Sequence, residues 1–229
     1  MKISSSHSMK PKYDKKKILG LNLASNNSFD SHLWEGNKNM IKSINTKIGL
    51  LKTVKPFISK EALANVGGAL INSTILYGAP VWGNTTQTNL DRVQRAQTKA
   101  ARFIDGRGWK RDKQKSHRQT LLNELKWPNV EQIVNSSIIN LTKKAISNKS
   151  SQGINNLFAT HTPPNPRKTK GQRIAHKGHI LRNKNSFSGK ATHLYNCLPE
   201  NLKNSEITPK LFKTKLKEHM KTQHLLKEH

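Results

Sequence analysis

The chain has 229 residues, with 41 Lys or Arg against 13 Asp or Glu and a formal net charge of +28. This charge repels itself in a compact chain and is relieved when a polyanion binds, so the composition favours nucleic acid as the partner. Hydrophobic residues make up only 33% of the chain, which predicts a modest helical core with long polar segments and argues against membrane spans.

The N-terminal third begins with a polar leader, residues 1–16, that we expect to be disordered. Residues 18–23 predict a short strand, which ends at the polar turn 25–28. A helix is predicted from about residue 29 to residue 54, ahead of a proline. From residue 36 to residue 60 the only charged residues are lysines.

Ser59 is predicted to cap the next helix, in which Gly67 and Gly68 would let another backbone approach closely. Trp82 closely follows a proline, and Trp127 directly precedes one. We expect both side chains to pack in the core.

Residues 89–104 predict a helix with two faces, for which Thr88 would be the cap. One face is mostly apolar, and the other carries a row of cations at positions i, i+3, i+7 and i+10: Arg92, Arg95, Lys99 and Arg102. Cations at this spacing suit a phosphate backbone, and the alternative interpretation is a solvated helix face.

The loop after this helix is basic and contains a tryptophan that is the best candidate for stacking on a base. The candidate binding residues of this loop are Arg107, Trp109, Lys110 and Arg111. A capping box at Ser116 and Gln119 predicts a short helix to about residue 125. Residues 129–146 follow as the clearest amphipathic helix.

No Asp or Glu occurs between Glu131 and Glu200, and we interpret residues 148–186 as an irregular cationic segment that orders on a phosphate backbone. The alternative is a flexible linker with incidental charge. The candidate binding residues here are Arg167, Lys168, Lys170, Arg173, Lys177 and Arg182. Thr208 and Pro209 open a final helix to about residue 226.

The sequence offers little for catalysis. Two-metal nucleotidyl transfer needs closely placed carboxylates, and none of the five aspartates is paired with another acid, so we assign no catalytic residue. A weak zinc pattern occurs in His176, His179, His193 and Cys197, whose residue types suit tetrahedral zinc. Ten histidines in a polar, basic chain also produce such a pattern by chance, and no metal site is our main expectation.

Several short blocks resemble, in order, the C-terminal part of reverse transcriptases encoded by non-LTR (LINE-type, jockey-like) retrotransposons. The most recognisable is Tyr-Gly-Ala-Pro-Val-Trp-Gly at 77–83 with the helix 92–104. Near the end, Tyr-Asn-Cys-Leu-Pro at 195–199 resembles the family's Trp-Asn-x-Leu-Pro signature, with Tyr195 in a packing role. Weaker matches lie at 17–23, 28–33, 48–52, 59–63, 187–188 and 212–217.

The resemblance implies RNA-directed DNA polymerisation for a complete family member, with Mg²⁺ as its cofactor. For this chain it implies only the thumb and the region beyond it, which would hold the template–primer by its backbone. The family's catalytic aspartates have no counterpart in residues 1–16. We therefore expect no enzyme activity and no cofactor in this chain alone, and a partner that supplies the palm and fingers.

Together these features predict a mainly α fold, a helical thumb-like bundle with one short N-terminal strand and a long irregular basic loop. The expected segments are a leader (1–16), a thumb-like helical region (17–105), a helical extension (106–147), an irregular basic segment (148–190) and a C-terminal helical segment (191–229).

Our first hypothesis is a reverse-transcriptase fragment that binds RNA or DNA largely independently of sequence, because phosphate contacts position without specifying bases. The alternatives are a stand-alone basic architectural or RNA-binding protein and a small zinc-dependent nucleic-acid-binding module. The solitary cysteine and the polar first residues predict an intracellular protein, nuclear or cytoplasmic and not secreted.

Overall fold

The structure, a computed structural model, describes residues 15–26, 28–106, 115–161, 173–176, 186–203 and 207–226. These residues are mainly helical, as the sequence predicts. The elements in chain order are β1 (Lys15–Ile18), β2 (Leu21–Ala24), α1 (Asp30–Leu33), α2 (Met40–Val54), the 3-10 helix η1 (Lys55–Phe57), α3 (Lys60–Leu76), α4 (Ala79–Trp82), α5 (Gln87–Asp105), α6 (Lys115–Glu124), α7 (Val130–Ile146), α8 (Gln152–Asn155), β3 (Phe158–His161), β4 (Arg173–His176), α9 (Phe187–Asn196), α10 (Glu200–Lys203) and α11 (Pro209–Leu226).

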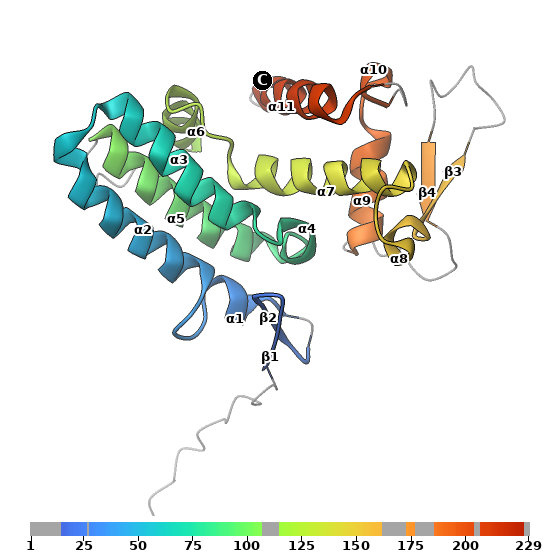
Figure 1. Cartoon of the computed structure of the whole chain (residues 1–229), viewed down its shortest axis with the longest axis horizontal. Coiled ribbons are helices and arrows are strands. Elements are labelled where there is room, and N and C mark those ends of the chain that lie inside the picture. Colours follow the sequence, from blue (N-terminus) through green and yellow to red (C-terminus); the bar gives the residue numbers. More distant parts are fainter. Residues whose placement is uncertain are drawn as a thin grey trace, which may run out of the picture.

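The helices form two groups joined by α7 (Figure 1). In one group α2, α3 and α5 lie side by side and contact one another. In the other, α9, α11 and the β3–β4 pair lie against α7. None of the helices in the described part of the chain is long and apolar enough to cross a bilayer.

The N-terminal strand is a correction to the sequence prediction. Instead of one unpaired strand over 18–23, β1 and β2 pair antiparallel, with Ile18 opposite Leu21. The turn between them lies at Leu19 and Gly20, which both have positive φ angles of 46° and 81°. Left-handed turns match the twist of a hairpin, but leucine seldom adopts them, so the turn had no clear sequence signal. The hydroxyl of Tyr77 donates to the carbonyl of Leu19 and holds this turn against the end of α3.

The long helix predicted over 29–54 is also wrong, because the chain leaves the helical conformation after α1. Gly36 has a φ of 77°, and α2 begins only after Asn39. The Asn39 side chain accepts from the backbone N–H of Lys42 and donates to the carbonyls of Trp34 and Gly36 at 3.0 and 2.9 Å. The buried Asn39 side chain therefore pairs with backbone groups of the connection after α1 and with the first turn of α2. These hydrogen bonds favour a break at this point over a continuous helix.

His32 of α1 is buried, only 8% exposed, and its Nε2 has no hydrogen-bond partner. Burial lowers the pKa of this imidazole below its ordinary value of 6.5. The unfolded chain therefore takes up a proton at a higher pH than the folded chain does. Stability is complete above pH 6.5 and falls as the pH falls toward the folded pKa.

We expect the free energy of unfolding, from urea titrations, to drop as the pH falls from about 6.5 to about 5.5, by at most about 1.4 kcal/mol per pH unit for this one group. In the variant His32→Phe the drop should be smaller. His219 of α11, whose pKa burial also lowers, contributes in the same direction and remains in both proteins. An unchanged pH dependence in His32→Phe would contradict this assignment.

The glycine pair of α3 lies where two large side chains approach. A Cβ on Gly67 would lie 2.4 Å from Cδ1 of Ile104, and one on Gly68 would lie 2.8 Å from Nε1 of Trp127. The close approach that the sequence predicted is therefore made by side chains and not by a second backbone. Trp127 is 5% exposed and donates to the carbonyl of Ala64 at 3.1 Å, which confirms its packing role.

Helix boundaries are partly as predicted. Ser59, Asn129 and Thr208 precede α3, α7 and α11, and each side chain accepts from a backbone N–H of the first turn. Thr88 is not the cap of α5, because Thr86 occupies that position and Thr88 lies inside the first turn. Ser116 likewise lies inside α6, and the capping box occurs instead at Asn129 of α7.

The segment predicted to be irregular over 148–190 contains regular structure. It holds α8 and the antiparallel strands β3 and β4, whose Phe158 and Ile174 are buried. Residues 162–172 and 177–185 lie outside the described residues. The prediction of one irregular loop is therefore too broad, because two buried apolar side chains hold a strand pair within it.

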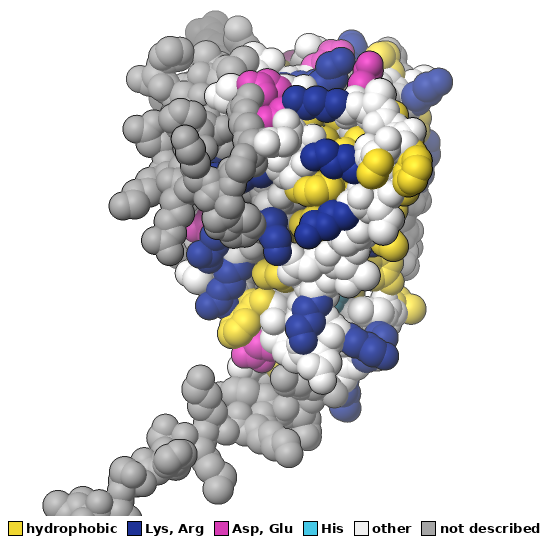
Figure 2. Space-filling model, turned by 90° about the vertical axis from the view of Figure 1, so that its left-hand side faces the viewer, with side chains coloured by type: hydrophobic (Ala, Val, Ile, Leu, Met, Phe, Trp, Pro, Cys, Tyr) yellow, Lys and Arg dark blue, Asp and Glu magenta, His cyan; other side chains and the backbone are white. Residues whose placement is uncertain are grey.

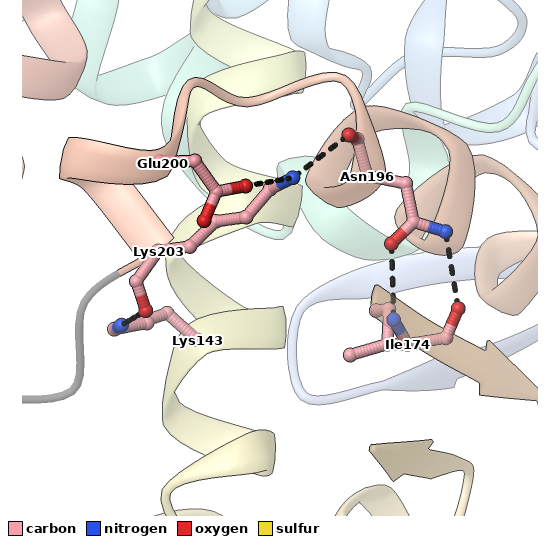
Figure 3. Close-up of polar contacts among 5 residues, drawn as sticks. All are labelled: Lys143, Ile174, Asn196, Glu200 and Lys203. Atoms are coloured by element: carbon pink, nitrogen blue, oxygen red, sulfur yellow. Dashed lines mark hydrogen bonds and ion pairs between the residues drawn. The ribbon is translucent and has the colours of Figure 1, made fainter. Parts of the chain in front are cut away.

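A side-chain clamp fixes β4 against α9. Asn196 accepts from the N–H of Ile174 and donates to its carbonyl, both at 3.0 Å (Figure 3). The Lys203 ammonium donates to the Asn196 carbonyl at 3.0 Å and lies 3.7 Å from Glu200, while Lys143 donates to the Lys203 carbonyl. An amide side chain thus takes the place of a third strand at the edge of β4.

Tyr195, which precedes the clamp, is 1% exposed, as its predicted packing role requires. Burial, with a further contribution from the charge of Glu200, raises the pKa of its hydroxyl to about 12.

Candidate nucleic-acid interface

The four cations of the predicted row on α5 lie in different surroundings. At its first position, Arg92 lies with its guanidinium 4.0 Å from the centre of the Trp34 ring. Its Nη1 donates to Oδ1 of Asn89 at 3.3 Å, and Asn89 donates to the Asp30 carboxylate at 2.6 Å. Burial raises the pKa of the Asp30 carboxyl, but the side-chain hydrogen bonds that it receives and the charge of Arg92 together hold that pKa below its ordinary value of 3.8.

The Asp30 carboxylate therefore stays charged and offsets the charge of Arg92. Both residues line a cavity of about 930 Å³ that also reaches the start of α9. Arg92 is thus part of a polar network that ties α1 to α5. The next cation, Arg95, is exposed, and its Nε donates to the carbonyl of Asp91 within the same helix at 3.3 Å.

The last two cations of the row line a groove between α2 and α5, which we call the α2–α5 groove. Its volume is about 300 Å³, and Lys99 and Arg102 of α5 face Lys52 of α2 across it. The Lys99 ammonium donates to Oδ1 of Asn45 at 2.9 Å. No Asp or Glu is among the lining residues, which are Asn45, Ile48, Gly49, Lys52, Lys99, Arg102 and Phe103.

A further lysine extends the charge at the C-terminal end of α2. The Lys55 ammonium lies 4.7 Å from the centre of the Phe103 ring and donates to the Phe103 carbonyl at 3.1 Å. Beyond it, Lys60 forms an ion pair of 2.6 Å with Asp105. The residues that line the groove therefore include three cations and no Asp or Glu, and the Lys60–Asp105 pair lies outside this lining.

The surface on the side of α2 has the same character. Figure 2 shows many Lys and Arg side chains along this face and few Asp or Glu side chains. Lys52, which lines the groove, and Lys55, which contacts Phe103 beside it, were not among the predicted binding residues. Their signal was the run from residue 36 to residue 60 without an acid, but only the packing of α2 on α5 brings them beside Lys99 and Arg102.

For the other predicted binding residues the structure describes no side chain. Arg173 lies in β4, but its side chain is not described. The remaining candidates lie outside the described residues: Arg107, Trp109, Lys110, Arg111, Arg167, Lys168, Lys170, Lys177 and Arg182.

Two of the four zinc candidates lie close together. Sγ of Cys197 is 3.9 Å from Nε2 of His193, one turn away on α9, and both residues are exposed. His176 ends β4, which packs against α9, but its side chain and the whole of His179 are outside the description. In the described ranges no three His, Cys, Asp or Glu side chains gather as a metal site would require, and the zinc hypothesis stays a prediction.

Comparisons of this chain with protein-family models, with curated proteins and with solved structures found no match. The resemblance to reverse transcriptases therefore stays a prediction that depends on the residues of this sequence alone.

Proposed function

We propose that this chain is the C-terminal, thumb-like part of a retrotransposon-type RNA-directed DNA polymerase and that it holds an RNA/DNA duplex by its backbone. The observation that carries the proposal is the α2–α5 groove, where Lys52, Lys99 and Arg102 line one cavity without a carboxylate among them. The proposal assigns no bond-making step to this chain, and Mg²⁺ would belong to a complete polymerase.

The groove suits phosphates for two physical reasons. First, ammonium and guanidinium groups from two helices release condensed counterions when they contact a phosphate backbone, which favours binding to any sequence. Second, part of the groove is held in place before a ligand arrives, because Asn45 fixes Lys99, and the neighbouring Lys55 is likewise held by the Phe103 ring. Such preorganisation lowers the entropy cost of ordering long side chains on binding.

The proposal also includes a partner that supplies the palm, and the β1–β2 hairpin supports this part. Ile18 and Leu19 at its turn are 55% and 87% exposed. Exposed apolar residues at the N-terminal end suit contact with a palm. With nucleic acid as the ligand, we place the protein in the nucleus or the cytoplasm.

The test of the groove removes two of its charges. The double variant Lys99→Ala/Arg102→Ala should bind an RNA/DNA duplex more weakly at about 0.1 M salt, by up to roughly 60-fold if both residues contact phosphates, because each contact contributes a salt slope of about −0.9. The matched control is Lys213→Ala/Lys217→Ala on the exposed side of α11, which lowers the net charge equally. Filter binding over a range of salt concentrations measures both effects.

Wild-type binding should show a slope of log K against log salt near −5 if about six phosphates are neutralised. The groove variant should have a shallower slope and should weaken duplexes of unrelated sequence alike. A flat salt response of the wild type, or equal losses in the groove and control variants, would reject the groove as the binding site.

A stand-alone architectural or RNA-binding protein would use the same groove, and what favours a polymerase origin is the order of the sequence blocks. The genomic sequence upstream of Met1 separates the two hypotheses. An open frame there that encodes a Phe-x-Asp-Asp motif supports the polymerase, and its absence at an intact locus favours the stand-alone protein.

A further inference from the structure

A second basic cavity lies on the opposite side of α2, between the β1–β2 hairpin, α2 and the end of α3. We call this cavity of about 700 Å³ the hairpin pocket, and its charged lining residues are Lys17, Lys38, Lys42 and Lys47. No Asp or Glu lines it, and most of the other lining side chains carry hydroxyl or amide groups. The pocket therefore presents positive charge and hydrogen-bonding groups together.

The pocket is separate from the α2–α5 groove because the helical period of α2 divides its residues. Lys42, Thr46 and Lys47 line the hairpin pocket, whereas Asn45 and Lys52 line the groove. The two cavities share no lining residue. A ligand in one does not need the side chains of the other.

The walls of the pocket are held by hydrogen bonds that reach across elements. Asn22 of the hairpin donates to the carbonyl of Lys38, and the Lys47 ammonium donates to the carbonyl of Leu70 at 3.2 Å and to the hydroxyl of Thr74. Lys17, Lys38 and Lys42 are exposed, and the Lys42 ammonium donates to Oδ1 of Asn37 at 3.4 Å. Lys47 is thus a fixed part of the wall, while Lys17, Lys38 and Lys42 are exposed to a ligand in the pocket.

The second observation is His32, which lines the pocket although it is 92% buried, with a Nε2 that has no hydrogen-bond partner. A buried polar atom without a partner costs free energy, and such atoms are rare in folded proteins. Asn39, which is equally buried in the same wall, has its side chain fully engaged with backbone groups. Several buried side-chain atoms of the described residues lack a partner, and among them only Nε2 of His32 belongs to a residue that lines this cationic pocket, where an anion that reached it would be its acceptor.

We propose that the hairpin pocket binds a polyphosphate or phosphomonoester group, with Lys17, Lys38 and Lys42 as its cationic contacts. Lysines bind phosphate as compact point charges, and several together match a group with more than one negative charge. A volume of about 700 Å³ lies within the range of pockets that hold small molecules of nucleotide size. The phosphate comes either from a free nucleotide or from the 5′ end of a nucleic-acid strand.

The test is titration calorimetry of the full chain with tripolyphosphate at about 0.15 M salt, where long-range surface attraction is screened. We expect saturable binding at one site. The variant Lys38→Ala/Lys42→Ala should bind at least about tenfold more weakly, since a hydrogen bond to a charged group contributes that much or more. Both lysines are exposed, so the variant should keep the wild-type circular dichroism spectrum and melting temperature.

The matched control is Lys213→Ala/Lys217→Ala on the exposed side of α11, whose tripolyphosphate affinity should stay within about twofold of the wild type because neither lysine lines the pocket. In NMR spectra the imidazole signals of His32 should shift on saturation. Competition by a 5′-phosphorylated oligonucleotide but not by its 5′-hydroxyl form would identify a strand end as the source. Competition by ATP but by neither oligonucleotide would identify a free nucleotide.

Three results would overturn the proposal: no saturable binding, equal losses in the pocket variant and in Lys213→Ala/Lys217→Ala, or undiminished binding in Lys38→Ala/Lys42→Ala. The proposal does not depend on the α2–α5 groove. Failure of the groove variant to weaken duplex binding would refute the proposed function and leave this site untouched.

Discussion

Replacing Trp82 with Ala is expected to destabilise the fold by about 3–5 kcal/mol, the cost of deleting a buried tryptophan side chain. Trp82 is 0% exposed at the end of α4, and its Nε1 donates to the carbonyl of Tyr77 at 2.9 Å. The variant leaves both a cavity and a carbonyl without its donor. Since domains are stable by only about 5–15 kcal/mol, this loss removes a large share of the total.

Urea unfolding followed by far-ultraviolet circular dichroism measures the effect, and Trp82→Phe should fall between the wild type and Trp82→Ala. The matched control is Phe57→Ala, which deletes an aromatic side chain that is 84% exposed and should change stability by less than about 0.5 kcal/mol. A Trp82→Ala variant within about 1 kcal/mol of the wild type would show that α4 does not pack as described.

Replacing Gly83 with Ala is the second substitution with a large expected effect, because α4 meets α7 at this residue. An added Cβ would lie 2.4 Å from the carbonyl oxygen of Ala79 and 2.4 Å from Cγ1 of Val134. The φ of Gly83 is −67°, which alanine adopts without strain, so the whole cost is steric. The Val134 contact is relieved only if α4 moves away from α7, and the Ala79 contact only if the turn of α4 itself shifts, so we expect a loss of about 1–3 kcal/mol or more.

The control for Gly83→Ala is another Gly→Ala change with the opposite expected sign. Gly49 lies inside α2, where an added Cβ would have nothing within 4 Å. Alanine there should stabilise the chain by about 0.5–1 kcal/mol, because it lowers the backbone entropy of the unfolded state. Melting temperatures of the two variants should therefore shift in opposite directions. A shift of Gly83→Ala in the same direction as Gly49→Ala would contradict the close packing of α4 on α7.

Elements with local signals were predicted well. The apolar repeat of residues 129–146 lies within α7, and the serine or threonine before α3 and α11 caps the helix as expected. These features depend on residues three or four positions apart, and such spacing is visible in the sequence. The hairpin was missed because its turn uses Leu19 in a left-handed conformation, held by the distant Tyr77.

The candidate interface was likewise predicted only where its signals are local in the sequence. Helical spacing correctly placed Arg92, Lys99 and Arg102 on α5, but it did not show which elements cover each part of that face. Arg92 meets Asp30 and Trp34 of the N-terminal segment, so its charge is offset.

By itself the sequence determined the strong positive charge, the mainly helical class, the burial of Trp82 and Trp127 and the starts of α3, α7 and α11, since all of these follow from composition or from neighbours within one turn. Only the tertiary structure decided that Lys99 and Arg102 share a groove with Lys52 and that lysines of the opposite side of α2 share a pocket with a buried histidine. The physical reason is distance along the chain. Asn45, which fixes Lys99, lies 54 positions away, and such neighbours are chosen by the packing of whole helices rather than by local spacing.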